Sequence, residues 1–256
     1  MENYIDNIAL QNAFLLENGD HRSLIASVDK DRVEQDILKD GEPAFQPFAS
    51  TYEAVEHEHS RDLEEDDKDL IEQIHGLVQG SKAEARRSIK MLQKLKRKYP
   101  NIPTIYNFIS VAYATLDNEK KRYHTIKMTC KVFPHYLFGK ITLAEHKISY
   151  GDFEDIPEVF DHKLQLYMHY PDAELNAEGI PTFHASEVQA FYATVAQYYI
   201  RKNQLARALK CYFLVESANR ESPYLHGLAG EIMIAEVSNK MLGSITEAAA
   251  KSLGDE

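Results

Sequence analysis

Residues 103–134 read PTIYNFISVAYATLDNEKKRYHTIKMTCKVFP, and this stretch decides the fold that the sequence predicts. It ends in Phe133-Pro134, and a matching pair, Tyr99-Pro100, stands just before it. Because the two prolines are 34 residues apart, the stretch is one period of an internal repeat. Pro103 suits the first turn of a helix, and Asn118 suits a turn between helices. One period therefore predicts two helices joined by a short turn.

The same pattern continues on both sides of this stretch. From about residue 68 onward, apolar side chains recur at helical spacing, so we expect helices of about 13 to 17 residues joined by short turns. Upstream, Ser81–Tyr99 combines an apolar face with a strongly basic one. Downstream the pattern bends, because Tyr170-Pro171 closes a unit 37 residues after Pro134 and Pro157 falls in the first turn of its second helix. The last unit is more regular and contains Ala208-Leu-Lys-Cys-Tyr212.

The period and these residue types resemble the tetratricopeptide repeat family. The resemblance is carried in the central unit by Tyr106, Ile109, Ser110, Tyr113 and Pro134. It covers residues 67–220 in four units and implies an all-α fold, an α-solenoid of antiparallel helix pairs. Small side chains are expected where helices approach closely, at Ser110, Ala144, Ala196 and Ala208. A helical bundle without repeats is the alternative fold.

Two segments flank the repeats. Residues 1–66 are expected to form an acidic N-terminal extension that is helical only in part, because the prolines within Gly41–Phe48 interrupt a regular helix. Residues 67–256 are expected to form the repeat domain. A capping helix over Pro223–Met241 would cover its last apolar face.

Charge and composition argue against several classes of function. The chain has 40 acidic against 29 basic residues and a net charge of -11, so it repels phosphate backbones and nucleic acid is not an expected partner. The sequence has neither a secretory leader nor an apolar run long enough for a membrane span, so we expect a soluble, cytoplasmic protein without membrane insertion. Cys130 and Cys211 have no CxxC spacing and imply no disulfide framework.

No residue is expected to be catalytic, to bind a cofactor or to hold a metal ion. His57-Glu58-His59 lacks a third ligand, and histidines two residues apart point to different sides of a helix. The glycines of Gly76–Lys82 are one residue too close for a phosphate loop. The basic helix Lys82–Lys98 could attract an external anion, but the preferred interpretation is that the acidic run Glu56–Asp69 neutralises it within the molecule.

The family resemblance also implies a binding surface. In tetratricopeptide proteins the first helix of each unit lines a concave groove. The residues that would line it here are Asn107, Val111, Phe138, Ile141, Glu145, Ile148, Gln197, Ile200 and Arg201. We expect Phe138, Ile141, Ile148 and Ile200 to be exposed there as a contact patch, the alternative being that neighbouring segments bury them.

The expected function is therefore that of a non-catalytic protein–protein interaction scaffold. The family's carboxylate clamp is not expected, because its Asn and Arg positions fall on Phe108 and Leu143, so an amphipathic helix or an extended apolar peptide is the expected ligand. Two other classes stay open. One is a secretion-type chaperone or assembly subunit, and the other is an enzyme with its site in the insertion Tyr170–Ser186, near His184 and Glu187. Homo-oligomerisation is also left open.

Overall fold

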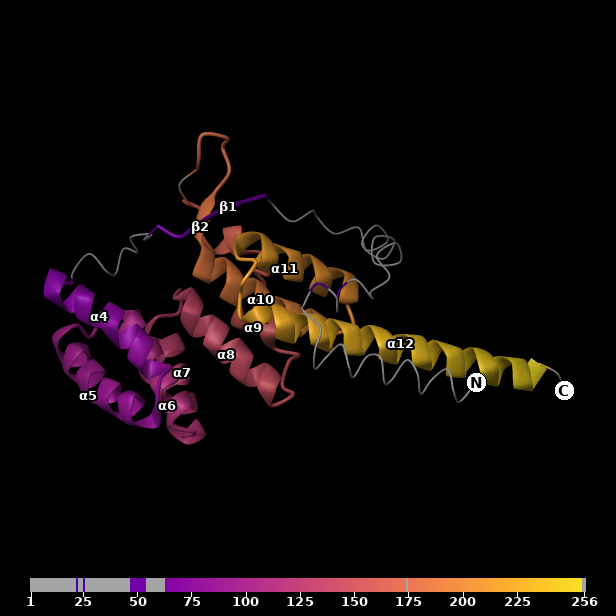
Figure 1. Ribbon diagram of the computed structural model, residues 1–256, viewed down its shortest axis with the longest axis horizontal. Coiled ribbons are helices and arrows are strands. Elements are labelled where there is room, and N and C mark those ends of the chain that lie inside the picture. The colour runs from indigo at the N-terminus through magenta and orange to yellow at the C-terminus, as the bar shows by residue number, and fades with distance from the viewer. Residues whose placement is uncertain (1–21, 23–24, 26–46, 54–62, 174, 255–256) are drawn as a thin grey trace. The chain divides into compact units, whose positions relative to one another are not determined.

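The computed structural model describes Arg22, Ile25 and residues 47–53, 63–173 and 175–254, with side chains up to residue 243. These residues are mostly helical, as the sequence predicts (Figure 1). Their contacts group them into two units, which we name by their ranges: a 52–175 unit, and a 176–254 unit that also includes the short strand ending at Thr51. The sequence-based division after residue 66 stays a prediction.

The 52–175 unit is a series of helices, and each of its α-helices packs against the next one. Its elements are α4 (Glu65–Val78), α5 (Lys82–Lys98), α6 (Pro103–Thr115), α7 (Glu119–Val132), α8 (Leu137–Ser149), α9 (Ile156–Val159) and the 3-10 helix η2 (Leu166–His169). In addition, α4 contacts α6, and α6 contacts α8. The first helices of successive pairs are therefore neighbours.

Local sequence explains where these helices begin and end. Ser81 caps α5 with a capping box, in which its hydroxyl accepts from the Glu84 N–H at 3.3 Å and the Glu84 carboxylate accepts from the Ser81 N–H at 2.7 Å. Pro103 stands in the first turn of α6, where its missing N–H has no helical partner to lose. Asn118 caps α7 by accepting from the Lys121 N–H. The predicted lengths of α5, α6 and α7 are confirmed.

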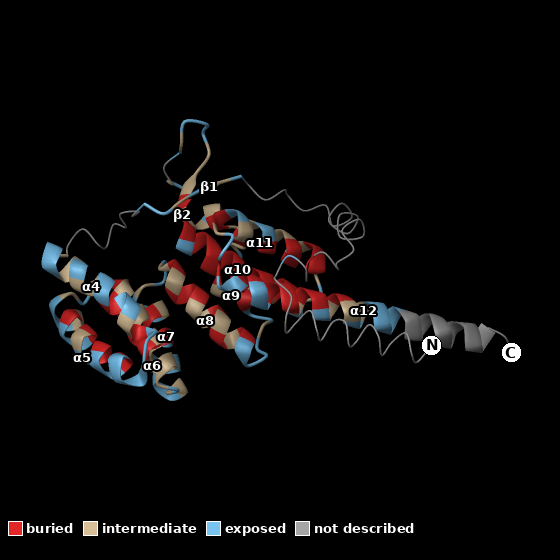
Figure 2. Cartoon of the chain, in the orientation of Figure 1, coloured by how far each residue is buried: buried red, intermediate tan, exposed pale blue. Residues whose placement is uncertain are grey.

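The core of the 52–175 unit is made by the facing sides of α4, α5 and α6. Ile74, Leu92 and Ile105 are each 0% exposed and represent these three helices in it. Figure 2 shows the alternation of buried and exposed positions along α5, which is the amphipathic pattern read from the sequence.

The third helix pair is irregular. α8 is a full helix, but α9 has only four residues and contains Pro157. The chain then turns through Asp161 and His162, which both have positive φ, at 53° and 60°. Ion pairs accompany apolar packing in this region: buried Lys140 pairs with Asp161, and Lys147 pairs with Asp152 at 2.5 Å, while Ile156, Phe160 and Leu166 are each 0% exposed.

The 176–254 unit is a helical unit with a small sheet. Its elements are β1 (Ala49–Thr51), β2 (Thr182–His184), α10 (Ala185–Arg201), α11 (Leu205–Ala218) and α12 (Tyr224–Gly254). The strands pair in parallel with Ser50 opposite Phe183, a feature that the sequence analysis did not predict. α12 packs against both α10 and α11 and extends beyond the predicted capping helix, which was expected to end at Met241.

Burial supports the predicted close contacts between helices. The four small side chains expected there are each 1% exposed or less; they are Ser110, Ala144, Ala196 and Ala208. α10 is buried at all but three of its 17 residues (Figure 2). Small residues at these positions let helix backbones approach without leaving voids.

Candidate functional site

In the 52–175 unit, α4, α6 and α8 are the first helices of successive helix pairs. Together they form one continuous surface. The His75 ring of α4 stacks on the Phe108 ring of α6, with centroids 5.2 Å apart and planes 6° from parallel. The Thr142 hydroxyl of α8 lies 3.1 Å from Asn107 Oδ1 of α6. We call the surface made by His75, Asn107, Phe108, Val111 and Thr142 the α4–α6–α8 surface.

This surface is mixed in polarity and partly exposed. Phe108 and Val111 pack against the core of the unit with one side and are only partly buried. The Thr142 hydroxyl is also 2.8 Å from the Phe138 carbonyl, and its single proton serves only one acceptor at a time. When that proton serves the Phe138 carbonyl, Asn107 Oδ1 does not receive it.

The predicted contact patch is partly wrong. Asn107, Val111, Phe138 and Glu145 are half-buried, so they remain accessible in part. Ile141 and Ile148 were expected to be exposed, but they are only 3% and 5% exposed. Their exposure was inferred from the family resemblance alone.

The periodicity of α8 gives the physical reason for this error. Leu137, Ile141, Ala144 and Ile148 follow one another at intervals of four, three and four residues, and all are buried. Apolar residues at this spacing form a single stripe, the usual core face of a helix. Leu143 lies beside the stripe and is half-buried.

The predicted residues of the last unit lie against α12. Ile200 is 7% exposed, so its expected exposure is wrong as well. Gln197 donates to Glu231 of α12 at 3.5 Å, and Arg201 pairs with the same carboxylate at 3.6 Å. These two polar side chains connect α10 to α12, and their role in binding stays a prediction.

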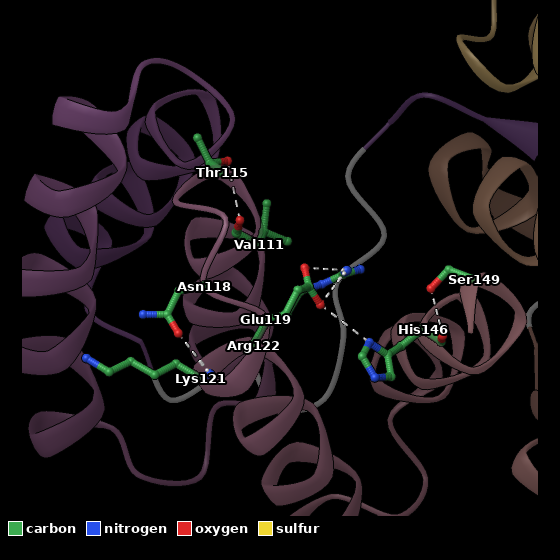
Figure 3. A network of polar contacts seen from close by, with 8 residues as sticks. All are labelled: Val111, Thr115, Asn118, Glu119, Lys121, Arg122, His146 and Ser149. Carbon is green, nitrogen blue, oxygen red and sulfur yellow. Dashed lines mark hydrogen bonds and ion pairs between the residues drawn. The ribbon is translucent and has the colours of Figure 1, made fainter. Parts of the chain in front are cut away.

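A polar network joins α7 to α8 next to this surface (Figure 3). Glu119 pairs with Arg122 at 3.3 Å, and its other oxygen lies 3.7 Å from His146 Nδ1. The His146 ring stacks on Tyr123 with centroids 4.4 Å apart. Burial, with Arg122 nearby, lowers the pKa of His146 despite the opposing effect of Glu119. A neutral His146 thus packs as an aromatic ring between the two helices.

The two cysteines and the two residues named for an enzyme site, His184 and Glu187, lie in environments that the structure defines. Burial raises the pKa of the Cys130 thiol to about 11 and also raises that of Cys211, so both thiols stay protonated at neutral pH. His184 caps α10, because its Nδ1 accepts from the Ser186 N–H at 3.2 Å and lies 2.7 Å from the Ser186 hydroxyl. Glu187, the other residue named for an enzyme site, is 3% exposed.

Metal ligands do not converge in the described part of the chain, where no three His, Cys, Asp or Glu residues are placed to hold an ion. His57 and His59 lie outside the described residues. Among the helices that the structure describes, none combines the length and the apolar character that crossing a membrane requires.

Sequence reasoning missed the contribution of α4. The first of the four repeat units is a weak match, and no residue of α4 was included in the predicted groove. The signal that was available is the apolar stripe of Leu70, Ile71, Ile74 and Val78, which leaves His75 on a neighbouring face of the helix.

The chain matches no protein-family model, no curated protein and no solved structure.

Proposed function

We propose that this chain is a non-catalytic scaffold for protein–protein interaction, in which helix pairs stack as in a tetratricopeptide-like solenoid and the α4–α6–α8 surface binds a helix or an extended peptide. The observation that carries the proposal is the continuity of that surface. Two contacts tie its three helices together, the stack of His75 on Phe108 and the contact of Asn107 with Thr142.

Hydrogen-bonded residues on successive helix pairs are separated along the sequence by nearly the same number of residues, which supports a repeat. Thr115 donates to the Val78 carbonyl, 37 residues away, and Asn107 and Thr142 are 35 residues apart. In the 176–254 unit, Gln197 and Glu231 are 34 residues apart. Contacts at nearly one period are what stacked helix pairs produce.

The chemistry of the surface fits a peptide better than a small polar molecule. Phe108 and Val111 offer apolar area, while Asn107 and Thr142 supply hydrogen bonds beside it. An amphipathic helix or an extended segment uses this combination, because its apolar side chains provide affinity and its polar groups fix the register.

The test is a quantitative affinity purification from the native host with a matched pair of variants. Val111→Arg places a long charged side chain on the surface, and Phe213→Arg makes the same kind of change at the 41% exposed Phe213 of α11. We expect the stoichiometric partner of the parent to be lost with Val111→Arg and kept with Phe213→Arg. Retention of that partner by a folded Val111→Arg variant would contradict the proposal.

A milder substitution tests the same surface in case the Val111→Arg variant does not fold. Asn107→Ala removes one hydrogen-bonding group from a half-buried position. We expect it to weaken the same partner by about 1 kcal/mol while the melting temperature stays near that of the parent. Unchanged affinity for the partner would remove Asn107 from the binding surface.

A further inference from the structure

A row of cations runs along the exposed side of α5, opposite its buried face. We call Arg86, Lys90, Lys94 and Arg97 the basic stripe; all four are exposed. A helix rises about 1.5 Å per residue, so the stripe is about 16 Å long with a charge roughly every 5 to 6 Å. Ala85, Ile89 and Leu92 face the core from the other side of the helix.

These charges have no ionic partners among the described residues. The acidic run before α5 was expected to neutralise this helix, and within the described part of the chain Glu64 and Asp67 do so only at Lys98, each at 2.7 Å. At the other end, Lys82 pairs with Asp117 at 2.5 Å. No ion pair of the described residues involves the four cations between them.

The stripe stands out against the charge of the whole protein. Residues 82–132 contain 13 Lys or Arg and three Asp or Glu, whereas the chain has a net charge of -11. Like charges one turn apart on a helix repel each other and destabilise it. A negatively charged partner would relieve this repulsion.

An apolar hollow lies directly beside the stripe, between α4 and α5. Its volume is about 300 Å³, and it is lined by Asp67, Leu70, Met91, Lys94, Leu95 and Lys98. Leu70, Met91 and Leu95 provide apolar walls, and Lys94 belongs to both the hollow and the stripe. Because Asp67 is engaged by Lys98 and by the Tyr99 hydroxyl, Lys94 is the cation left to meet a ligand there.

We propose that the basic stripe and this hollow bind a short acidic segment of a partner protein, with an apolar side chain of that segment in the hollow. Carboxylates spaced along the segment would pair with Arg86, Lys90 and Arg97. This docking surface is on α5 and goes beyond the proposed function, which concerns the α4–α6–α8 surface.

The same observations disfavour nucleic acid as the occupant. α5 contains no aromatic residue, so it offers no platform on which a base could stack. The stripe is also short, and a long phosphate polymer reaching past it would meet the negative charge of the remaining chain. An apolar hollow with a lysine at its edge suits a leucine-like side chain flanked by carboxylates.

Fluorescence anisotropy with defined probes tests the proposal on the full chain. The probe is a labelled short peptide of glutamates with a central leucine, and the same peptide with alanine at the centre tests the hollow. We expect the leucine peptide to bind the parent about tenfold more tightly than the alanine peptide. Equal affinities would remove the hollow from the proposal.

Two triple variants separate a built site from general electrostatics. Lys90→Gln, Lys94→Gln and Arg97→Gln remove three charges from the stripe, whereas Lys120→Gln, Lys127→Gln and Lys131→Gln remove three exposed charges from α7, outside the residues that line the hollow. We expect the first variant to lose about tenfold or more in affinity for the leucine peptide and the second less than about threefold. An equal loss in both would overturn the proposal, as would no measurable binding by the parent.

The other polyanions serve as competing probes. Single-stranded RNA, double-stranded DNA and phosphatidylserine vesicles should each bind the parent more weakly than the leucine peptide at the same salt concentration. Tighter binding of any one of them would replace the acidic peptide as the occupant. Circular dichroism of each variant verifies that the helices are intact, which is expected because all six lysines and arginines replaced are exposed.

Discussion

The pair α6–α7 and the region from α8 to η2 each begin with a full-length helix. They differ in the segment that packs against this first helix. In α6–α7 the second helix has 14 residues, and Ile105, Ile126 and Thr129 are each 1% exposed or less. After α8, the second helix has only four residues, and ion pairs of Lys140 and Lys147 accompany the buried apolar side chains of Ile156, Phe160 and Leu166. Packing between two long helices therefore stabilises the regular pair, whereas the irregular region combines buried apolar side chains with ion pairs.

The largest loss of folding stability is expected for a substitution in the regular pair α6–α7. Ile105→Ala removes a fully buried side chain from the core of the 52–175 unit. We expect it to lower the free energy of unfolding by about 3 kcal/mol, because it removes apolar contacts and leaves a cavity. Chemical denaturation followed by circular dichroism measures this, and a loss below about 1 kcal/mol would show that packing is not what holds this pair.

A smaller and asymmetric effect is expected in the irregular region. The Lys140 side chain is 8% exposed and that of Asp161 is 57% exposed. Asp161→Asn suits the positive φ and leaves a buried ammonium unpaired, so we expect a loss of about 2 kcal/mol. Lys140→Met removes the buried charge itself and should cost less than about 1 kcal/mol. If Lys140→Met proves the costlier of the two in the same denaturation measurement, the ion pair is not the main contact there.

The smallest effect is a pH dependence in the same irregular region. His169 Nε2–H donates to the Lys163 carbonyl at 2.9 Å, and burial lowers the pKa of His169 to about 4. The folded protein therefore binds fewer protons than the unfolded chain between pH 6.5 and about 4. The stability contributed by neutral His169 is present above pH 6.5 and is lost as the pH falls toward 4.

The matched variants are His169→Gln and, as a control, His124→Gln at an exposed position of α7. Relative to the parent, His169→Gln should become less destabilised as the pH is lowered from 7 to 4, while the difference for His124→Gln stays constant. The measurement is the melting temperature of the parent and of each variant at several pH values between 7 and 4. Parallel curves for the parent and His169→Gln would mean that His169 does not cause the pH dependence.

Much of the fold was predictable because its signals are local. Pro103 and Asn118 mark the start of α6 and of α7, and the 34-residue spacing of Pro100 and Pro134 marks the length of a pair. The short β1–β2 pairing was not predictable, because it joins Ala49 to Thr182 across more than half of the chain and no local pattern specifies that register.

The candidate site was only partly predictable, because exposure was assigned from the family resemblance, and Ile141, Ile148 and Ile200 are all buried. Asn107 and Val111 were placed by resemblance on a helix that is regular, and both are accessible in part. Ile141 and Ile148 were assigned to the groove in the same way. They lie on α8, whose partner helix α9 has only four residues, and both are buried. Here the spacing of apolar residues within α8 was the better guide, since it reports burial without assuming a regular partner helix.

Site-specific photo-crosslinking tests the central claim, that the α4–α6–α8 surface binds a protein partner, most directly. p-Benzoylphenylalanine replaces Phe108 on that surface in one sample and the exposed Phe213 of α11 in another, a conservative exchange at both positions. After irradiation in the native host, mass spectrometry identifies the crosslinked peptides. The account predicts that one partner segment is attached at position 108 and absent at position 213. Attachment of the partner at position 213 with none at position 108 would contradict it.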